Sequence, residues 1–347
     1  MYRDIPLLLS LVFMAGGFVA LAWSSDRFVR DAAALARALG VSPFIVGMVV
    51  IGFGTSAPEL CVSLLSGISD HANLSLGNAY GSCIFNIAVI LGVAAMIAPI
   101  AVRPLTAFVA GPGLAAISAF SYWLLRDGSC ARPEAFALLA LFAVVMPFYC
   151  WFDQKTKGVA ADDSQPAGQS PSVPVARTLL SLLFGLAALV GSAHILVWGA
   201  VDFARFLHVS DLLIGLTIVA VGTSLPELAS AIASARRGEH EFVLGNIVGS
   251  NLFNTLAVVG MATAISPITP ESGGFSPYIL SRDLPLLTLL SLSITAFGAN
   301  WRSWRSPGRI GRFAAALWLR GKGAMVLAFL AAAAELAYLN QIGRAHV

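Results

Sequence analysis

Charged residues are scarce in this chain of 347 residues: Asp, Glu, Lys and Arg make up only 11% of it. A typical soluble domain carries about 25% charged residues. Hydrophobic residues account for 58% of the chain, and its mean hydropathy is +0.82. Most of the chain must therefore face lipid or other buried helices. This composition excludes an ordinary soluble domain and indicates an integral membrane protein.

Several other signatures are missing. The 21 basic residues are spread over short connectors and the net charge is only +3, which argues against nucleic acid as a partner. The 4 cysteines show no metal-type or disulfide-framework spacing. No suitable pair of aspartates lies inside an apolar run, so an intramembrane aspartyl protease is not supported. We expect no cofactor, and the sequence gives no sign of a protein partner.

Long apolar segments are abundant instead. Runs of about 20 residues, the length that spans a membrane as a helix, occur about ten times. They lie at 5–25, 41–68, 74–98, 104–125, 134–152, 178–204, 209–235, 242–266, 277–298 and 321–340. We interpret the first run as a membrane helix and not a cleaved signal peptide, because it is long and follows a single arginine. The sequence therefore predicts an all-α membrane protein.

A polar segment divides these runs into five and five. Residues 153–176 are rich in Asp, Ser, Gln, Gly and Pro and read as a flexible linker. The halves are then 1–152 and 177–347. An odd number of spans in each half places the two halves upside down relative to each other, as in the inverted repeats of many secondary transporters. We therefore predict two inverted five-helix repeats.

Basic residues predict the orientation. With the N-terminus outside, 15 of the 21 lie in the inner connectors, which fits the positive-inside rule. They are Arg27, Arg30, Arg37, Arg103, Lys155, Lys157, Arg177, Arg236, Arg237, Arg302, Arg305, Arg309, Arg312, Arg320 and Lys322. We expect both termini to be extracytoplasmic, the linker to be cytoplasmic, and the protein to span the plasma membrane several times.

An internal repeat supports the division. The segment Gly47–Leu60 recurs as Gly215–Leu228, and Gly77–Asn86 recurs as Gly245–Asn254, both shifted by 168 positions. Of these 24 aligned positions, 13 are identical, and the identities include the polar residues and helix breakers. The repeated motifs extend over 47–92 and 215–260.

Only two acidic residues lie deep inside predicted spans: Glu59 and Glu227, one in each copy of the motif. A carboxylate at the centre of a membrane helix costs at least about 2.5 kcal/mol. A structural ion pair would explain them, but no Lys, Arg or His lies mid-span in the motifs. The paired carboxylates therefore favour an ion site shared by the two halves.

The residues around both glutamates offer oxygen ligands. Hydroxyls and amides recur at helical spacing in both copies: Thr55, Ser56, Asn78, Ser82 and Asn86 match Thr223, Ser224, Asn246, Ser250 and Asn254. A proline before each glutamate, Pro58 or Pro226, frees a backbone carbonyl as a further ligand. Hard cations such as Ca²⁺ take six to eight oxygen ligands, whereas transition metals favour His or Cys.

At these residues the chain resembles the sodium/calcium exchanger family, the calcium/cation antiporters. The resemblance lies in Gly54-Thr-Ser-Ala-Pro-Glu59 with Gly77–Asn86, and in Gly222-Thr-Ser-Leu-Pro-Glu227 with Gly245–Asn254. It implies exchange of Ca²⁺ against Na⁺ by alternating access. By this resemblance, Glu59, Glu227, Thr55 and Thr223 would bind Ca²⁺; Ser56, Ser224, Ser82, Ser250 and the backbone oxygens of Gly52 and Ala220 would line Na⁺ positions; Asn86 and Asn254 would line the central position.

Two positions depart from the family pattern. Cys83 stands where the second copy has Asn251, and we expect it to affect helix packing more than ligation. Asn254 stands where some members carry Asp, which leaves two carboxylates and weakens the case for K⁺ co-transport. Ca²⁺/H⁺ exchange at the same site is the alternative, because protons can also neutralise carboxylates. A cation channel is less well supported, since a channel needs no duplicated switching halves.

Overall fold

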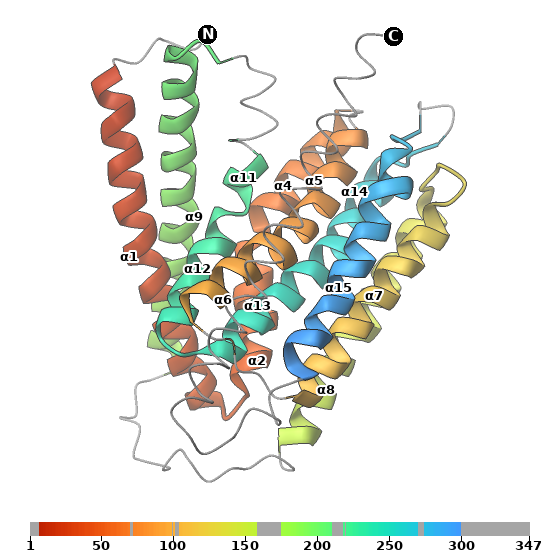
Figure 1. Cartoon of the computed structure of the whole chain (residues 1–347), viewed down its shortest axis with the longest axis horizontal. Helices are drawn as coiled ribbons and strands as arrows, with labels where there is room; N and C mark the ends of the chain where they lie inside the picture. The colour runs from red at the N-terminus through yellow and green to blue at the C-terminus, as the bar shows by residue number, and fades with distance from the viewer. Residues whose placement is uncertain are drawn as a thin grey trace.

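The structure is a computed structural model that describes residues 7–69, 72–98, 100, 104–157, 175–209, 218, 220–269 and 274–299. These residues are helical almost throughout (Figure 1). The first half contains α1 (Leu7–Leu39), α2 (Pro43–Val46), the π-helix η1 (Gly47–Gly52), α3 (Phe53–Thr55), α4 (Ala57–Ile68), α5 (Ala72–Phe85), the π-helix η2 (Asn86–Ile90), α6 (Leu91–Ile97), α7 (Pro104–Leu125) and α8 (Arg132–Lys157). The second half contains α9 (Val175–Phe206), α11 (Ala220–Thr223), α12 (Leu225–Arg236), α13 (His240–Leu252), the π-helix η4 (Phe253–Val258), α14 (Val259–Ile265), the π-helix η6 (Ile279–Asp283) and α15 (Leu284–Ala299).

Six helical segments of the described residues are long and apolar enough to cross a membrane: Leu7–Leu39, Leu74–Ile97, Phe108–Leu125, Arg132–Thr156, Val175–Phe206 and His240–Ile265. A bent pair, Pro43–Thr55 with Ala57–Ile68, raises the number to seven. The prediction of an all-helical membrane protein is therefore confirmed. The predicted run at 321–340 lies outside the described residues, and the count of ten helices stays a prediction.

Two long helices, α1 and α9, stand side by side on the left of the molecule in Figure 1. Their contacts run in opposite directions: Ser24 Oγ lies 3.3 Å from Ser192 Oγ, while Gly17, earlier in α1, meets the backbone of Leu196, later in α9. A Cβ on Gly17 would come within 2.7 Å of the Leu196 backbone nitrogen. The two helices are therefore antiparallel, and small residues let their backbones approach closely.

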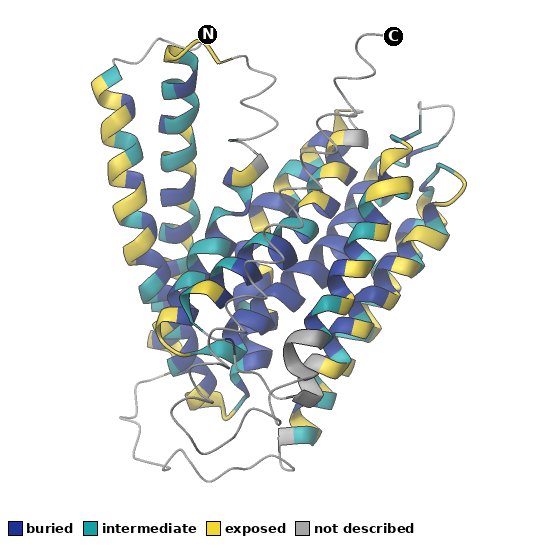
Figure 2. Cartoon of the chain, in the orientation of Figure 1, coloured by how far each residue is buried: buried dark blue, intermediate teal, exposed yellow. Residues whose placement is uncertain are grey.

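The core of the molecule lies among α4, α5, α12, α13 and α14. Figure 2 shows the segment of α13 and α14 largely buried, whereas α1, α7 and α9 expose much of their surface. Helix α13 and the following η4 and α14 form one segment, His240–Ile265, whose most apolar stretch is completely buried. A helix that is apolar on all sides is buried in the core of a large protein or in a membrane bundle, and here the surrounding helices cover it.

A break at Ser56 interrupts the first repeated motif. The chain bends by 44° between Pro43–Thr55 and Ala57–Ile68. Pro58 explains the bend, because a proline inside a helix cannot donate a backbone hydrogen bond and its ring clashes with the preceding turn. The second motif breaks at the corresponding place, Ser224, between α11 and α12. The predicted proline distortion is thus present in both halves.

Candidate cation-binding site

Both membrane glutamates lie at helix N-termini created by these breaks. Glu59 is in the first turn of α4, and Glu227 is in the first turn of α12. The N-terminus of a helix carries partial positive charge and unpaired N–H groups, which favour a nearby carboxylate. Each side chain is only 1% exposed. The broken helices therefore place two buried acids where the backbone tolerates negative charge.

Two hydrogen bonds cross between the halves and bring these acids into one site. Ser224 Oγ donates to Glu59 Oε1 at 3.0 Å, and Ser56 Oγ donates to Glu227 Oε1 at 2.9 Å. Each serine belongs to one copy of the motif and binds the carboxylate of the other copy. The predicted meeting of the two carboxylates is therefore present, and the serines hold it in place.

Four further predicted groups, Ser82, Ser250, the Gly52 carbonyl and Thr55, are placed by hydrogen bonds. The Ser82 hydroxyl lies 3.4 Å from the Ser224 hydroxyl. Ser250 Oγ donates to the Gly52 carbonyl at 3.1 Å, which brings together two groups from opposite halves. Thr55 is fully buried and donates to its own helix, to the Ile51 carbonyl at 2.9 Å. In this arrangement its hydroxyl oxygen keeps acceptor capacity for a ligand.

The asparagines one helical turn before Ser82 and Ser250 have a further role that the sequence did not predict. Asn78 Nδ2 donates to the backbone carbonyl of Glu59 at 3.1 Å, and Asn246 Nδ2 donates to that of Glu227 at 3.4 Å. Each amide therefore fixes the first turn that carries a glutamate. The repeat of Asn at this position was visible in the sequence, but its backbone partner was not.

Among the described residues that leave buried polar atoms without a hydrogen-bond partner, four are related in pairs by the repeat. They are Glu59 Oε2, Glu227 Oε2, and both side-chain polar atoms of Asn86 and Asn254. An unsatisfied buried polar group costs about 1–3 kcal/mol. These four residues therefore offer oxygen atoms that no described part of the chain engages.

Asn86 and Asn254 lie in the π-helices η2 and η4, at matching places in the repeat. Both are buried, and no hydrogen bond among the described residues connects them to the two glutamates. Their predicted place at the centre of the site stays a prediction. Thr223 precedes the break at Ser224, and Ala220 begins α11, so both lie on the segment that leads into the site.

Cys83 packs between the core helices. Its Sγ lies 3.7 Å from the Asn251 carbonyl oxygen and 3.4 Å from Thr255 Oγ1. These contacts join α5 to α13 and η4. They agree with the expectation that this cysteine affects helix packing.

The chemistry of the cluster suits a hard cation. In the described part of the chain, no group of three or more His, Cys, Asp or Glu side chains is placed to hold a metal ion. The cluster instead combines two carboxylates with hydroxyl and backbone oxygens. Ca²⁺ prefers such oxygen ligands, whereas transition-metal sites are built from nitrogen and sulfur.

Fold and cluster together define a multi-pass helical membrane protein with a buried, oxygen-rich centre shared by two sequence repeats. A family model described as sodium/calcium exchanger protein matches residues 9–151 and 177–320. The chain belongs to the sodium/calcium exchanger family, a family of transporters, as the resemblance of its motifs implied.

Relatives cover nearly the whole chain. It is 39% identical over 297 residues to the putative antiporter CaxA of Alkalimonas amylolytica, covering 83% of this chain and 91% of that protein. It is 33% identical to the inner membrane protein YrbG of Escherichia coli strain K12, covering 87% and 92%. It is 30% identical to the sodium/calcium exchanger MaX1 of Methanosarcina acetivorans, covering 82% and 90%.

The fold is shared with a solved exchanger. A structure of the sodium-calcium exchanger NCX_Mj superposes with a TM-score of 0.75 at 27% sequence identity, covering 95% of this chain and all of that one, 100%. The chain is accordingly an integral membrane protein of the exchanger fold.

Proposed function

We propose that this protein exchanges Ca²⁺ for Na⁺ across a membrane, with Glu59 and Glu227 as the central ligands. The observation that carries the proposal is the pair of crossing bonds from Ser56 and Ser224, which hold two buried carboxylates together without a basic partner among the described residues. Two carboxylates carry two negative charges, which one Ca²⁺ balances. Membership of the sodium/calcium exchanger family supports the same assignment.

Antiport follows from competition for these charges. An empty pair of carboxylates is too costly to expose to the low-dielectric barrier, and only the neutralised pair can switch sides. Ca²⁺ and Na⁺ would use overlapping ligands, so that one displaces the other. On this proposal the oxygens of Thr55 and Thr223 complete the Ca²⁺ site. The groups proposed for Na⁺ are Ser56, Ser82, Ser224, Ser250, the carbonyls of Gly52 and Ala220, Asn86 and Asn254.

The two halves are proposed to be inverted repeats. A contact between residue i and residue j + 168 recurs between residue i + 168 and residue j: Gly17 meets Leu196, and Gly185 meets Phe28. Reciprocity of this kind is typical of a two-fold relation. Because α1 and α9 are antiparallel, the axis that exchanges them is perpendicular to both helices. If the helices cross the membrane, this axis lies in its plane, as inverted repeats require.

The distribution of basic residues supports the remaining features. We propose that the protein lies in the plasma membrane, with both termini outside and the linker inside, because 15 of 21 basic residues then fall on the cytoplasmic side. Ten membrane helices, five in each half, complete this topology.

The test is Na⁺-driven ⁴⁵Ca²⁺ uptake into proteoliposomes at clamped pH. Glu59→Gln and Glu227→Gln should each abolish uptake, because each removes one of the two charges that the cation balances. Glu134→Gln provides a matched control, since Glu134 lies in the first turn of α8 and outside the cluster. Uptake that persists in both site variants would contradict the assignment.

A second arm of this assay separates the counter-ions. A pH gradient replaces the Na⁺ gradient in vesicles without Na⁺. Uptake driven only by the pH gradient, and lost in both variants, would assign Ca²⁺/H⁺ exchange to the same carboxylates. Uptake that needs neither gradient would indicate a channel.

A further inference from the structure

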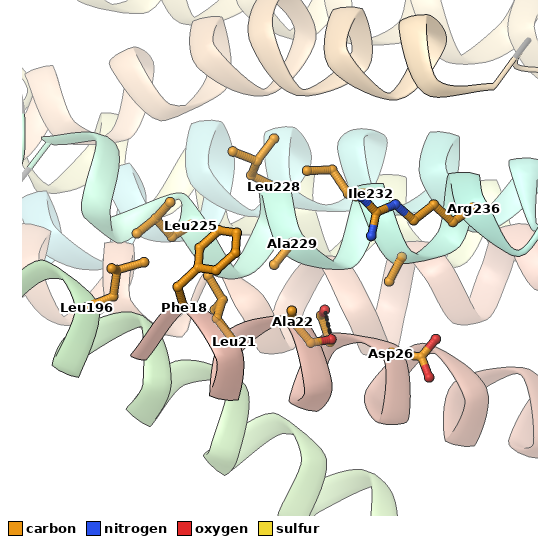
Figure 3. Close-up of a pocket in the computed structure, with 12 residues that line it drawn as sticks. Phe18, Leu21, Ala22, Asp26, Leu196, Leu225, Leu228, Ala229, Ile232 and Arg236 are labelled. Carbon is orange, nitrogen blue, oxygen red and sulfur yellow. Dashed lines mark hydrogen bonds between the residues drawn. The ribbon is translucent and has the colours of Figure 1, made fainter. Parts of the chain in front are cut away.

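A separate cavity of about 340 Å³ lies between α1, α9 and α12 (Figure 3). Its wall is apolar over most of its length: Phe18, Leu21, Leu196, Leu225, Leu228 and Ile232. The two charged residues in its lining, Asp26 and Arg236, lie together at one end (Figure 3). The hydroxyl of Ser25 is bonded to its own helix, to the Ala22 carbonyl at 3.0 Å. The cavity is therefore a groove with an apolar wall and charged side chains at one end.

The length of the groove matches one lipid leaflet. Along α12 it extends from Leu225 to Arg236, eleven residues apart, or about 16 Å at 1.5 Å per residue. Half of a hydrocarbon core of about 30 Å is about 15 Å. Phe18 is 64% exposed at the edge of the groove, and Val19 and Trp23 beside it are also exposed. This apolar side of α1 faces hydrocarbon, so an acyl chain has access to the groove.

The charge at the end of the groove is positive. Both carboxylate oxygens of Asp26 are occupied, Oδ1 by Arg237 at 2.6 Å and Oδ2 by Arg30 at 2.8 Å. Arg236 forms no ion pair with any described residue. The carboxylate of Asp26 is thus shared by Arg30 and Arg237, Glu239 also interacts with Arg237, and the Arg236 guanidinium has no ion-pair partner among the described residues. A phosphate group is the natural partner of an unpaired guanidinium.

We infer that this cavity binds one acyl chain of an anionic phospholipid, with the lipid phosphate on Arg236. The apolar wall of the groove suits an acyl chain, and the length of the groove matches the depth of one leaflet. The unpaired guanidinium of Arg236 favours an anionic headgroup. A bound chain touches α1 and α9 on one side and α12, which carries Glu227, on the other. An influence of the bound lipid on ion exchange rests on the proposed function, whereas the binding of the lipid does not.

Native mass spectrometry of the full chain in detergent tests the inference directly. The protein is incubated with equal concentrations of dioleoyl phosphatidylglycerol and dioleoyl phosphatidylcholine, and the bound lipids are counted. The wild type should retain phosphatidylglycerol preferentially. Arg236→Gln should lower this preference roughly fivefold, because one basic residue near a membrane surface contributes about 1 kcal/mol toward an anionic lipid. Arg126→Gln, an exposed arginine outside the cavity, should leave it unchanged.

Filling the groove supplies the second arm. Ala229→Phe should reduce retention of phosphatidylglycerol, and Ala22→Phe fills the groove from the opposite wall if the first variant does not fold. Ala140→Phe, on the exposed face of α8, should retain the lipid normally. Equal retention of the two lipids by the wild type would overturn the inference, as would undiminished retention in Arg236→Gln or in a folded groove-filling variant. Because this measurement does not involve transport, its failure is distinct from failure of the exchange assay.

Discussion

The two Gly-x-x-x-Gly segments have the same sequence pattern but different surroundings. In α13, Gly245 and Gly249 are buried against the backbone of η1 and its preceding turn. A Cβ on Gly249 would overlap the Met48 carbonyl oxygen and would lie 2.7 Å from the carbonyl carbon. In α5, Gly77 and Gly81 are exposed, and a Cβ on either would meet nothing within 4 Å. Alanine should therefore be tolerated at one repeat-equivalent position and not at the other.

The expected change in the free energy of unfolding follows from these distances. Carbon atoms pack best at about 3.5–4.0 Å, so Gly249→Ala must push two backbones apart by roughly 1 Å. Overpacking of this kind costs about 1–3 kcal/mol. The better helix propensity of alanine returns about 1 kcal/mol, which leaves a net loss of up to about 2 kcal/mol. Gly81→Ala gains helix propensity without any overpacking, so it should be neutral or should stabilise the fold by up to about 1 kcal/mol.

Thermal unfolding of the full chain in detergent, followed by size-exclusion chromatography after heating, measures this difference. Gly249→Ala should lower the midpoint, and Gly81→Ala should leave it unchanged or raise it. Equal destabilisation by the two variants would refute the reasoning, because it would mean that α5 is packed as closely as α13.

The same pair also bears on alternating access. On the proposed function, the two halves exchange conformations when the site switches sides. Gly81 would then take the packed environment that Gly249 has here. A bulky Gly81→Leu should therefore preserve stability while slowing Na⁺-driven ⁴⁵Ca²⁺ uptake, and normal uptake would show that α5 does not close in this way.

Four further variants test the surroundings of the site and the connector before α13. Ser56→Ala and Ser224→Ala each remove a hydrogen bond to a carboxylate, worth about 1.5–3 kcal/mol, and should weaken apparent Ca²⁺ affinity at least about tenfold; affinities near wild type in both would contradict the crossing arrangement. Cys83→Ala removes a contact between α5 and α13, and should lower stability by about 1 kcal/mol while leaving Ca²⁺ affinity unchanged, as titration of uptake would show. Burial raises the pKa of Glu239, in the connector before α13, so its ionised form disfavours the fold. Glu239→Gln should therefore raise the thermal midpoint at pH 8, and the gain should disappear below the unfolded carboxyl pKa of about 4.3; a gain independent of pH would exclude this cause.

The pairing of the glutamates was predictable because it depends on sequence features that cannot be explained otherwise. A carboxylate in an apolar run is costly enough to require a compensating feature, and the internal repeat indicates that the two glutamates form one site. Glu59 and Glu227 share the shift of 168 positions with Ser56 and Ser224, and the structure joins these four residues in one cluster. The prolines likewise predicted a distorted backbone, since their effect on a helix is local.

The π-helices were not predictable from the same patterns. Segments η2 and η4 carry Asn86 and Asn254, and each shifts the register of its helix within a few residues. π-helical turns occur frequently at functional sites. They depend on how neighbouring helices pack, however, and they leave the composition of an apolar run unchanged. The backbone bonds made by Asn78 and Asn246 were missed for a similar reason, because the accepting carbonyls belong to a different helix.

Unequal packing of the two halves is the feature that no repeat pattern can contain. Gly77–Asn86 and Gly245–Asn254 share their glycines, yet one segment lies against another backbone and the other is open. The repeat in the sequence does not determine which of the two segments is packed and which is open. Which half is closed depends on an energy difference between two arrangements of the whole chain, and a transporter requires this difference to be small. The asymmetry is therefore a property of the conformation and not of the motif, and for that reason the Gly249 and Gly81 variants should separate it from the symmetric site that the motif does encode.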